Sequence, residues 1–279
     1  SNVTAPDAIA AAIQPNTKLI FGEVVGNPSL DVMDVDTVGL IAADAGIPLI
    51  LDATFNTPYL FKPLDHGASI VIHSLTKWIG GHGIAVGGAI LDGGRFDWGA
   101  SDKFPTIAKP HYSMDAINFY EEFGPTAMTA KLRSEMMYNF GPCLSPTNAF
   151  HLLQGIETLP LRMQRHIENT DALLEYLNSH DDVAWVRHPH LESHPQHLMA
   201  KKLMPKGAGS IITFGVKGGR DAGQAFIEAV ELSSHLANVG DAKTLVIHPA
   251  STTHSHIDPE AMKEGGLSDD MIRLSVGLE

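Results

Sequence analysis

Short apolar runs alternate with helical stretches along the first 95 residues, and this alternation is what most constrains the fold. Strands are expected at 18–25, 47–51, 69–73 and 86–91, and helices at 5–13 and 36–45. Apolar runs separated by helices are typical of parallel strands that are buried on both faces of a sheet. In such sheets, ligands bind beyond the carboxyl ends of the strands.

Polar side chains follow three of these predicted strands, at the point where each strand ends. They lie in Glu23 to Asn27, in Asp52 to Thr54 and in Ser74 to Lys77. Because the carboxyl ends of parallel strands share one edge of the sheet, the sequence predicts a binding site at that edge.

The segment His73-Ser74-Leu75-Thr76-Lys77 places two hydroxyls and one lysine directly after a strand. Hydroxyls and exposed backbone N–H groups suit a phosphate, and a lysine can form a Schiff base with an aldehyde. Pyridoxal phosphate (PLP) carries both groups and also needs an acid opposite its ring nitrogen, for which Asp52 is the candidate. A lone Ser-x-Thr-Lys is more often a polar turn, so the surrounding residues are what favour the cofactor.

From residue 183 the pattern changes to that of a smaller α+β domain. Strands are expected at 183–186, 210–216, 244–247 and 271–276, and helices at 193–203 and 221–232. Before it, residues 126–138 are helical, and a helix that starts after Ser145 is expected to continue past Pro160 to Leu177 with a kink. The prediction is an α/β fold with a mostly parallel PLP-binding sheet and flanking helices in residues 1–160, followed by a smaller C-terminal α+β domain in residues 161–279.

Composition limits the partners. The chain has 279 residues, of which 44% are hydrophobic, enough for a sizeable core. A net charge of −13 without a basic tract argues against nucleic acid, and no apolar run reaches the ~18 residues of a membrane span. The single cysteine, Cys143, fits a reducing cytoplasm and is predicted to be a buried structural thiol.

Histidines are numerous, fifteen in all, and one group of them could suggest zinc. His188, His190, His194 and His197 lie close together in sequence, but no cysteine lies nearby. No metal is therefore predicted.

Motifs spread over nearly the whole chain resemble the Cys/Met-metabolism family of PLP enzymes, which has the aspartate-aminotransferase fold type. The motifs that carry the resemblance are Gly26-Asn27-Pro28, residues 52–58, residues 73–77, Gly81-His82-Gly83, residues 248–254 and residues 273–279. Further stretches, among them residues 144–150, 155–162 and 237–243, resemble the O-acetylhomoserine sulfhydrylase branch of this family.

The resemblance implies a role for each candidate residue. Lys77 would bind PLP and move protons, and Asp52 would pair with the ring nitrogen, with Thr54 beside it. Ser74 and Thr76 would donate to the phosphate, helped by the N-terminus of a helix that starts near Trp78. The substrate carboxylate would be bound by Arg273 with Asn238 and Ser251, and Asn27 would contact either the cofactor or that carboxylate.

The implied reaction is γ-replacement on O-acetyl-L-homoserine with sulfide or methanethiol, giving homocysteine or methionine plus acetate, in a cytoplasmic homodimer or homotetramer. A PLP-dependent γ-lyase of the methionine γ-lyase or cystathionine type is the alternative within the family. Full members are longer by an N-terminal portion of roughly one third. The sequence therefore also leaves open an inactive C-terminal fragment of such an enzyme.

Overall fold

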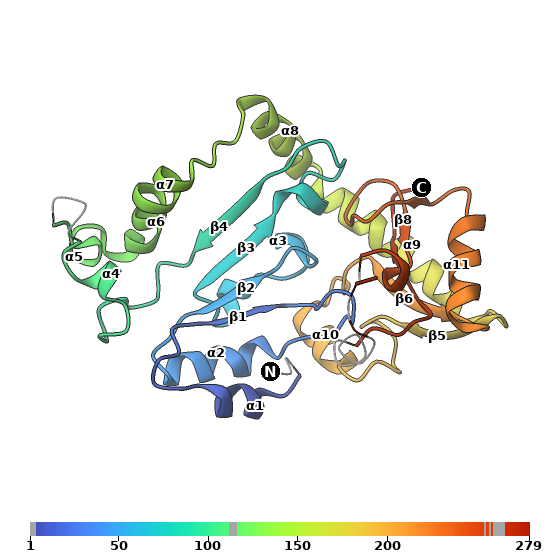
Figure 1. Cartoon of the computed structure of the whole chain (residues 1–279), viewed down its shortest axis with the longest axis horizontal. Coiled ribbons are helices and arrows are strands. Elements are labelled where there is room, and N and C mark those ends of the chain that lie inside the picture. Colours follow the sequence, from blue (N-terminus) through green and yellow to red (C-terminus); the bar gives the residue numbers. More distant parts are fainter. Residues whose placement is uncertain (1–3, 112–115, 254, 257, 259–265) are drawn as a thin grey trace.

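The structure is a computed structural model that describes residues 4–111, 116–253, 255–256, 258 and 266–279. Its first sheet has four strands in the order β1-β2-β3-β4 (Figure 1). The strands are β1 (Ile20–Glu23), β2 (Leu49–Asp52), β3 (Ile70–Ser74) and β4 (Gly88–Asp92). The first three run parallel, as predicted, and β4 runs antiparallel to β3. The expectation of a parallel β4 was wrong because only a single helical turn, and no crossover helix, separates it from β3.

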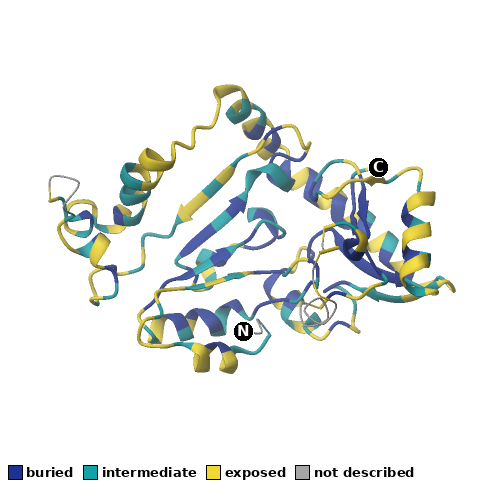
Figure 2. Ribbon diagram, viewed as in Figure 1, coloured by how far each residue is buried: buried dark blue, intermediate teal, exposed yellow. Residues whose placement is uncertain are grey.

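Burial alternates along β1 and β2, so the expectation of a sheet covered on both faces was also wrong. Leu49 and Leu51 are fully buried, whereas Phe21 is 59% exposed and Ile90 on β4 is 54% exposed. The buried face packs into a core that includes Val38 of helix α2 (Val35–Asp44). The other face of this sheet is only partly covered by the described residues, and Figure 2 shows exposed positions along β1 and β4.

The second sheet has the order β5-β6-β9-β8-β7 and forms a separate core with helices α9 and α11. Its strands are β5 (Val183–Arg187), β6 (Ile211–Val216), β7 (Ser234–His235), β8 (Leu245–Ile247) and β9 (Met271–Ser275). Neighbouring strands are antiparallel except for the short β7–β8 pair. This arrangement confirms the predicted α+β pattern in the second half of the chain.

The predicted continuous helix through Pro160 is two helices, α8 (Pro146–Glu157) and α9 (Leu159–Ser179). Pro160 lies in the first turn of α9, where a missing backbone N–H leaves no hydrogen bond unmade. The other α-helices are α1 (Pro6–Ala12), α3 (Thr57–Leu60), α4 (Pro105–Ala108), α5 (Phe119–Phe123), α6 (Ala127–Lys131), α7 (Tyr138–Phe140), α10 (His197–Leu203) and α11 (Gly219–Ala229). Short 3₁₀ turns lie at Pro63–His66, Gly124–Thr126 and Pro249–Ser251, and π-type turns at Leu75–Ile79 and Leu132–Met137.

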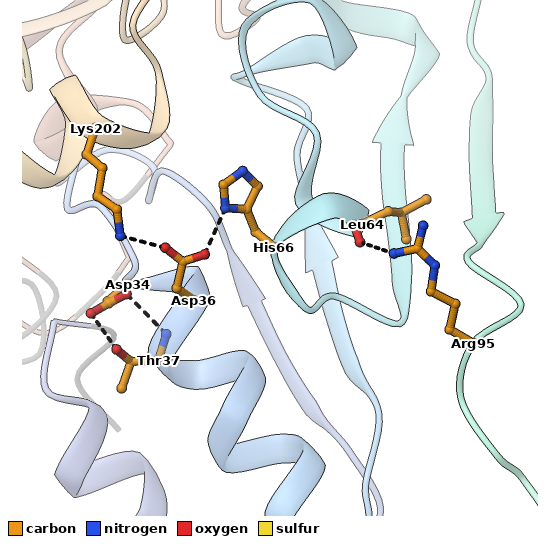
Figure 3. Close-up of polar contacts among 7 residues, drawn as sticks. All are labelled: Asp34, Asp36, Thr37, Leu64, His66, Arg95 and Lys202. Atoms are coloured by element: carbon orange, nitrogen blue, oxygen red, sulfur yellow. Dashed lines mark hydrogen bonds and ion pairs between the residues drawn. The ribbon is translucent and has the colours of Figure 1, made fainter.

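Polar contacts at the start of α2 join distant parts of the chain (Figure 3). Asp34 caps the helix by accepting from the backbone N–H and the hydroxyl of Thr37. The Asp36 carboxylate then contacts His66 Nδ1 at 2.8 Å and accepts from Lys202 of α10 at 2.7 Å. The contact with Lys202 therefore links the first sheet's helices to α10.

Cys143 is exposed, so the prediction of a buried thiol was wrong. It lies in residues 141–145, an irregular segment that joins α7 to α8 away from both cores (Figure 2).

Among the described residues, no helix combines the length and apolar character needed to cross a membrane. No group of three or more potential metal-ligating side chains is found in that same part of the chain.

Buried histidines predict a loss of stability in acid. Burial lowers the pKa of His166 from 6.5 to about 4, and its Nδ1 lies 2.7 Å from the Val276 carbonyl. Between pH 6.5 and about pH 4, His166 is protonated in the unfolded chain but stays neutral in the folded protein. The free energy of unfolding therefore decreases as the pH is lowered through this range. His166→Gln should reduce this pH slope by up to about 1.4 kcal/mol per pH unit in urea unfolding. His235→Gln, at an exposed site, is the control, and equal slopes in all three proteins would contradict the prediction.

Candidate active site

A cavity of about 330 Å³ lies where the carboxyl ends of β1, β2 and β3 meet the second sheet. Ligand sites have volumes of roughly 300–1,000 Å³. The cavity is lined by Glu23, Val25, Asn27, Asp52, Thr54, Phe55, Ser74, Lys77, Ala237, Asn238, Val239, Thr253 and Arg273. The three predicted strand ends are therefore brought together, and they are joined by residues from more than 150 positions further along the chain.

Lys77 lies in the π-type turn that follows β3, at φ −89° and ψ −137°, which is not a helical conformation. Its Nζ donates to the side-chain oxygen of Asn238. Burial lowers the pKa of Lys77, and the positive charge of Arg273 lowers it further. The predicted helix from Trp78 is absent, since the turn ends at Ile79 and is followed by Gly80 and Gly81.

Arg273 lies in the middle of β9 and is 7% exposed. Its Nη1 donates to the side-chain oxygen of Asn27 at 2.9 Å, and its Nη2 to the Asn238 carbonyl at 3.3 Å. Burial lowers its pKa to about 10. Its buried Nε has no hydrogen-bond partner among the described residues. A buried guanidinium held only by neutral oxygens, with a donor to spare, is suited to bind an anion.

Asp52 ends β2, and its carboxylate faces the same cavity. It accepts the backbone N–H of Thr54 at 2.8 Å. The Thr54 hydroxyl in turn accepts the backbone N–H of Ser74 at 2.9 Å. These two hydrogen bonds hold the ends of β2 and β3 together and orient the carboxylate.

Two predicted site residues, Thr76 and Ser251, are not among those that line the cavity. The Thr76 hydroxyl donates to the Gly87 carbonyl at 3.3 Å and accepts its N–H at 3.1 Å. Ser251 is exposed, and its hydroxyl lies 2.9 Å from His248 Nδ1. Both hydroxyls are thus engaged by groups that do not line the cavity.

Glu23 also lines the cavity; the sequence places it at a strand end but assigns it no role. It is the direct neighbour of Asp52 across β1 and β2, and it accepts the Asn27 N–H at 3.1 Å. Burial raises its pKa, and the nearby Asp52 charge raises it further. The sequence feature that could have identified Glu23 is its position near the end of a predicted parallel strand, as for Asp52.

These residues fit PLP. The fit rests on the half-buried amine of Lys77, on a carboxylate from a neighbouring strand and on the unpaired donor of buried Arg273. The first two are the groups that the cofactor requires, and the third suits a carboxylate substrate.

Comparison with known proteins agrees with this chemistry. The family model for Cys/Met metabolism PLP-dependent enzymes matches residues 1–279. A homocysteine synthase of Schizosaccharomyces pombe is 46% identical, and an O-acetyl-L-homoserine sulfhydrylase of Thermus thermophilus is 44% identical, each over 98% of this chain. The chain spans 64% and 65% of the lengths of these two relatives.

Solved structures give the same result. A protein named as an O-acetylhomoserine (thiol)-lyase from Campylobacter jejuni superposes with a TM-score of 0.95 at 33% identity, and its structure contains a pyridoxyl-lysine phosphate. The match covers all of this chain and 66% of that one. A cystathionine gamma synthase from Xanthomonas oryzae superposes with a TM-score of 0.81 at 33% identity, covering all of this chain and 64% of that one. With its strand-end cavity and a match along its whole length, the chain belongs to the Cys/Met metabolism family of PLP-dependent enzymes.

Proposed function

We propose that the chain binds PLP in the strand-end cavity and catalyses γ-replacement on O-acetyl-L-homoserine. The observation that carries the proposal is the meeting of Lys77, Asp52 and buried Arg273 in one cavity. The names of the relatives support the substrate class. In this reaction acetate leaves Cγ and a sulfur from sulfide or methanethiol bonds to the same carbon, giving homocysteine or methionine.

The cofactor would be held by the residues of the first sheet. Asp52 would face the ring nitrogen, with its carboxylate oriented by the Thr54 N–H. Ser74 would donate to the phosphate, and Thr76 would join it only by giving up its contacts with Gly87. When bound, PLP supplies stabilisation of the carbanions that form at the substrate carbons.

Lys77 would carry the protons between substrate carbons. A lysine does this best when its pKa lies near the working pH, and burial together with Arg273 shifts Lys77 in that direction. The Asn238 side-chain oxygen accepts from Nζ and so holds the amine on the cavity side of the turn.

Arg273 would bind the substrate α-carboxylate. Asn27 and the Asn238 carbonyl hold its two terminal nitrogens, which orients the planar group. Ser251, predicted to assist, would contribute only after leaving His248.

The proposed reaction is tested by product analysis of the purified protein reconstituted with PLP and given O-acetyl-L-homoserine. Homocysteine and acetate should form when sulfide is present, and Lys77→Ala should abolish turnover while Lys62→Ala, an exposed control, should not. Ammonia and a keto acid formed without sulfide would instead indicate γ-elimination. A protein that shows no PLP absorbance band would refute the proposal and favour an inactive chain.

Arg273→Lys tests the carboxylate site. A lysine cannot reproduce the planar two-nitrogen contact, so KM for O-acetyl-L-homoserine should rise roughly 10- to 100-fold. The PLP absorbance band should persist, because Arg273 is proposed to contact the substrate rather than the cofactor. A normal KM would contradict the assignment. Arg165→Lys, on the exposed side of α9, is the matched control.

We also propose that copies of the chain associate through an exposed apolar face around α7, α8 and the start of α9. Exposed apolar patches of this kind mark protein interfaces. The exposed apolar residues of this part of the chain are Tyr138, Phe140, Leu144, Phe150, Leu153, Ile156 and Leu161. A cytoplasmic homodimer or homotetramer agrees with this face and with the exposed thiol of Cys143.

We propose two domains, residues 1–160 and 161–279, with the boundary in the first turn of α9.

Leu161→Asp should dissociate this assembly. Leu161 is 72% exposed, and an acidic residue is well tolerated in the first turn of a helix, so the fold should be retained. Sedimentation velocity should show a smaller species. Leu198→Asp, at an 80% exposed position on α10, is the control and should leave the mass unchanged. A single mass shared by both variants and the unmodified protein would refute the interface.

A further inference from the structure

Arg162, on α9, is a buried cation outside the cavity. It is 6% exposed, and burial lowers its pKa. A guanidinium is costly to bury unless its N–H groups are hydrogen-bonded. The partners of Arg162 therefore indicate why it lies there.

Those partners are oxygens of the turn that carries Lys77 and of the α8–α9 junction. Arg162 Nη1 donates to the Trp78 carbonyl at 2.6 Å, and Nη2 to the Ile79 carbonyl at 3.1 Å. Nη2 also donates to the Gly155 carbonyl at 2.6 Å, and Nε to the Thr158 hydroxyl at 3.1 Å. Two of the four bonds reach the peptide groups immediately after Lys77.

The geometry of this contact leaves little freedom. A Cβ on Gly81 would lie 2.2 Å from Arg162 Nη1, and one on Gly155 would lie 2.5 Å from the Ile79 carbonyl oxygen. Gly81 also has φ +76°, a conformation that favours glycine. The guanidinium is thus enclosed between the lysine turn and the end of α8.

The same helix also contacts the segment that follows Arg273. His166 Nδ1 lies 2.7 Å from the Val276 carbonyl, and the Asn169 side-chain amide donates to the Gly277 carbonyl at 3.0 Å. These carbonyls come directly after β9. Helix α9 therefore contacts both the turn that carries Lys77 and the segment that directly follows the strand carrying Arg273.

From this geometry we infer that Arg162 is a positioning residue for Lys77, which it holds by fixing the Trp78 and Ile79 carbonyls. The inference rests on the proposed function, in which Lys77 must reach both cofactor and substrate. Arg162 acts only through the turn and touches none of the reacting groups. Its effect should therefore appear in the reactivity of one lysine and not in substrate affinity.

Arg162→Lys tests the inference in the whole 279-residue chain, because an ammonium keeps the charge but cannot reach all four oxygens. The first measurement is competitive acetylation of Lys77 against pH in cofactor-free protein, quantified by mass spectrometry. A loosened turn lets water reach the amine, so the Lys77 pKa should rise by roughly half a unit or more. Lys62 on the same protein is the internal reference, and Arg165→Lys is the control variant.

The second measurement is steady-state kinetics of the PLP-loaded protein. Arg162→Lys should lower kcat roughly 10-fold or more while KM changes less than about 2-fold, because misplacement of the amine slows the chemical steps. Thr158→Val removes the Nε partner and the bond from the Thr158 hydroxyl to the Gly155 carbonyl, but it leaves the other three acceptors of Arg162 in place. It should give a smaller change in the same direction. This milder variant serves as the test if Arg162→Lys fails to fold.

The outcomes separate the two proposals. Unchanged acetylation of Lys77 and unchanged kcat in both variants would overturn the role of Arg162 while leaving the proposed function intact. A variant that loses stability, with a lower kcat and a higher KM by similar factors, would also overturn this role, because it would indicate a purely structural residue. If the unmodified protein takes up no PLP, the proposed function fails, and the acetylation profile still decides whether Arg162 controls Lys77.

Discussion

Two cations share one half-buried cavity, and most of the site depends on how neutral oxygens keep them there. Lys77 Nζ and Arg273 Nη2 both donate to Asn238, the first to its side chain and the second to its carbonyl. Their mutual repulsion contributes to the lowered pKa of Lys77. Asp52 and Glu23 line the same cavity, but the hydrogen bonds of both cations go to asparagine oxygens, which leaves the cations able to attract an anionic ligand. The same contacts connect the loop at residues 237–239 to both sheets.

The two sheets meet at this cavity, and α9 reinforces the contact from behind. Arg162 hydrogen-bonds to the turn that carries Lys77, whereas His166 and Asn169 contact the carbonyls that follow β9. The polar residues of one helix thus connect elements that are about 200 positions apart in sequence. Burying an arginine and a histidine on one helix face is costly unless their polar groups find partners, and here main-chain carbonyls supply most of the partners.

Local patterns predicted the parts of the site that depend on local structure. Lys77 and Asp52 follow apolar strands, and parallel strands necessarily present their carboxyl ends on one edge. Arg273 could be singled out because an arginine within an apolar strand needs a partner. Thr76 and Ser251 matched the same motifs, yet their hydroxyls are engaged by Gly87 and His248, and sequence spacing does not reveal such competing hydrogen bonds.

The sequence by itself determined the α/β class, the strand ends that carry the site and the resemblance to a PLP-dependent family, because these depend on periodicity and on short motifs. Only the tertiary structure decided the direction of β4 and the exposure of Cys143. It also decided that Glu23 lines the cavity and that Arg162 hydrogen-bonds to the turn after Lys77. Each of these depends on which residues meet across long separations. Short-range patterns carry no information on such contacts, because the meeting of two elements is decided by the packing of the whole chain.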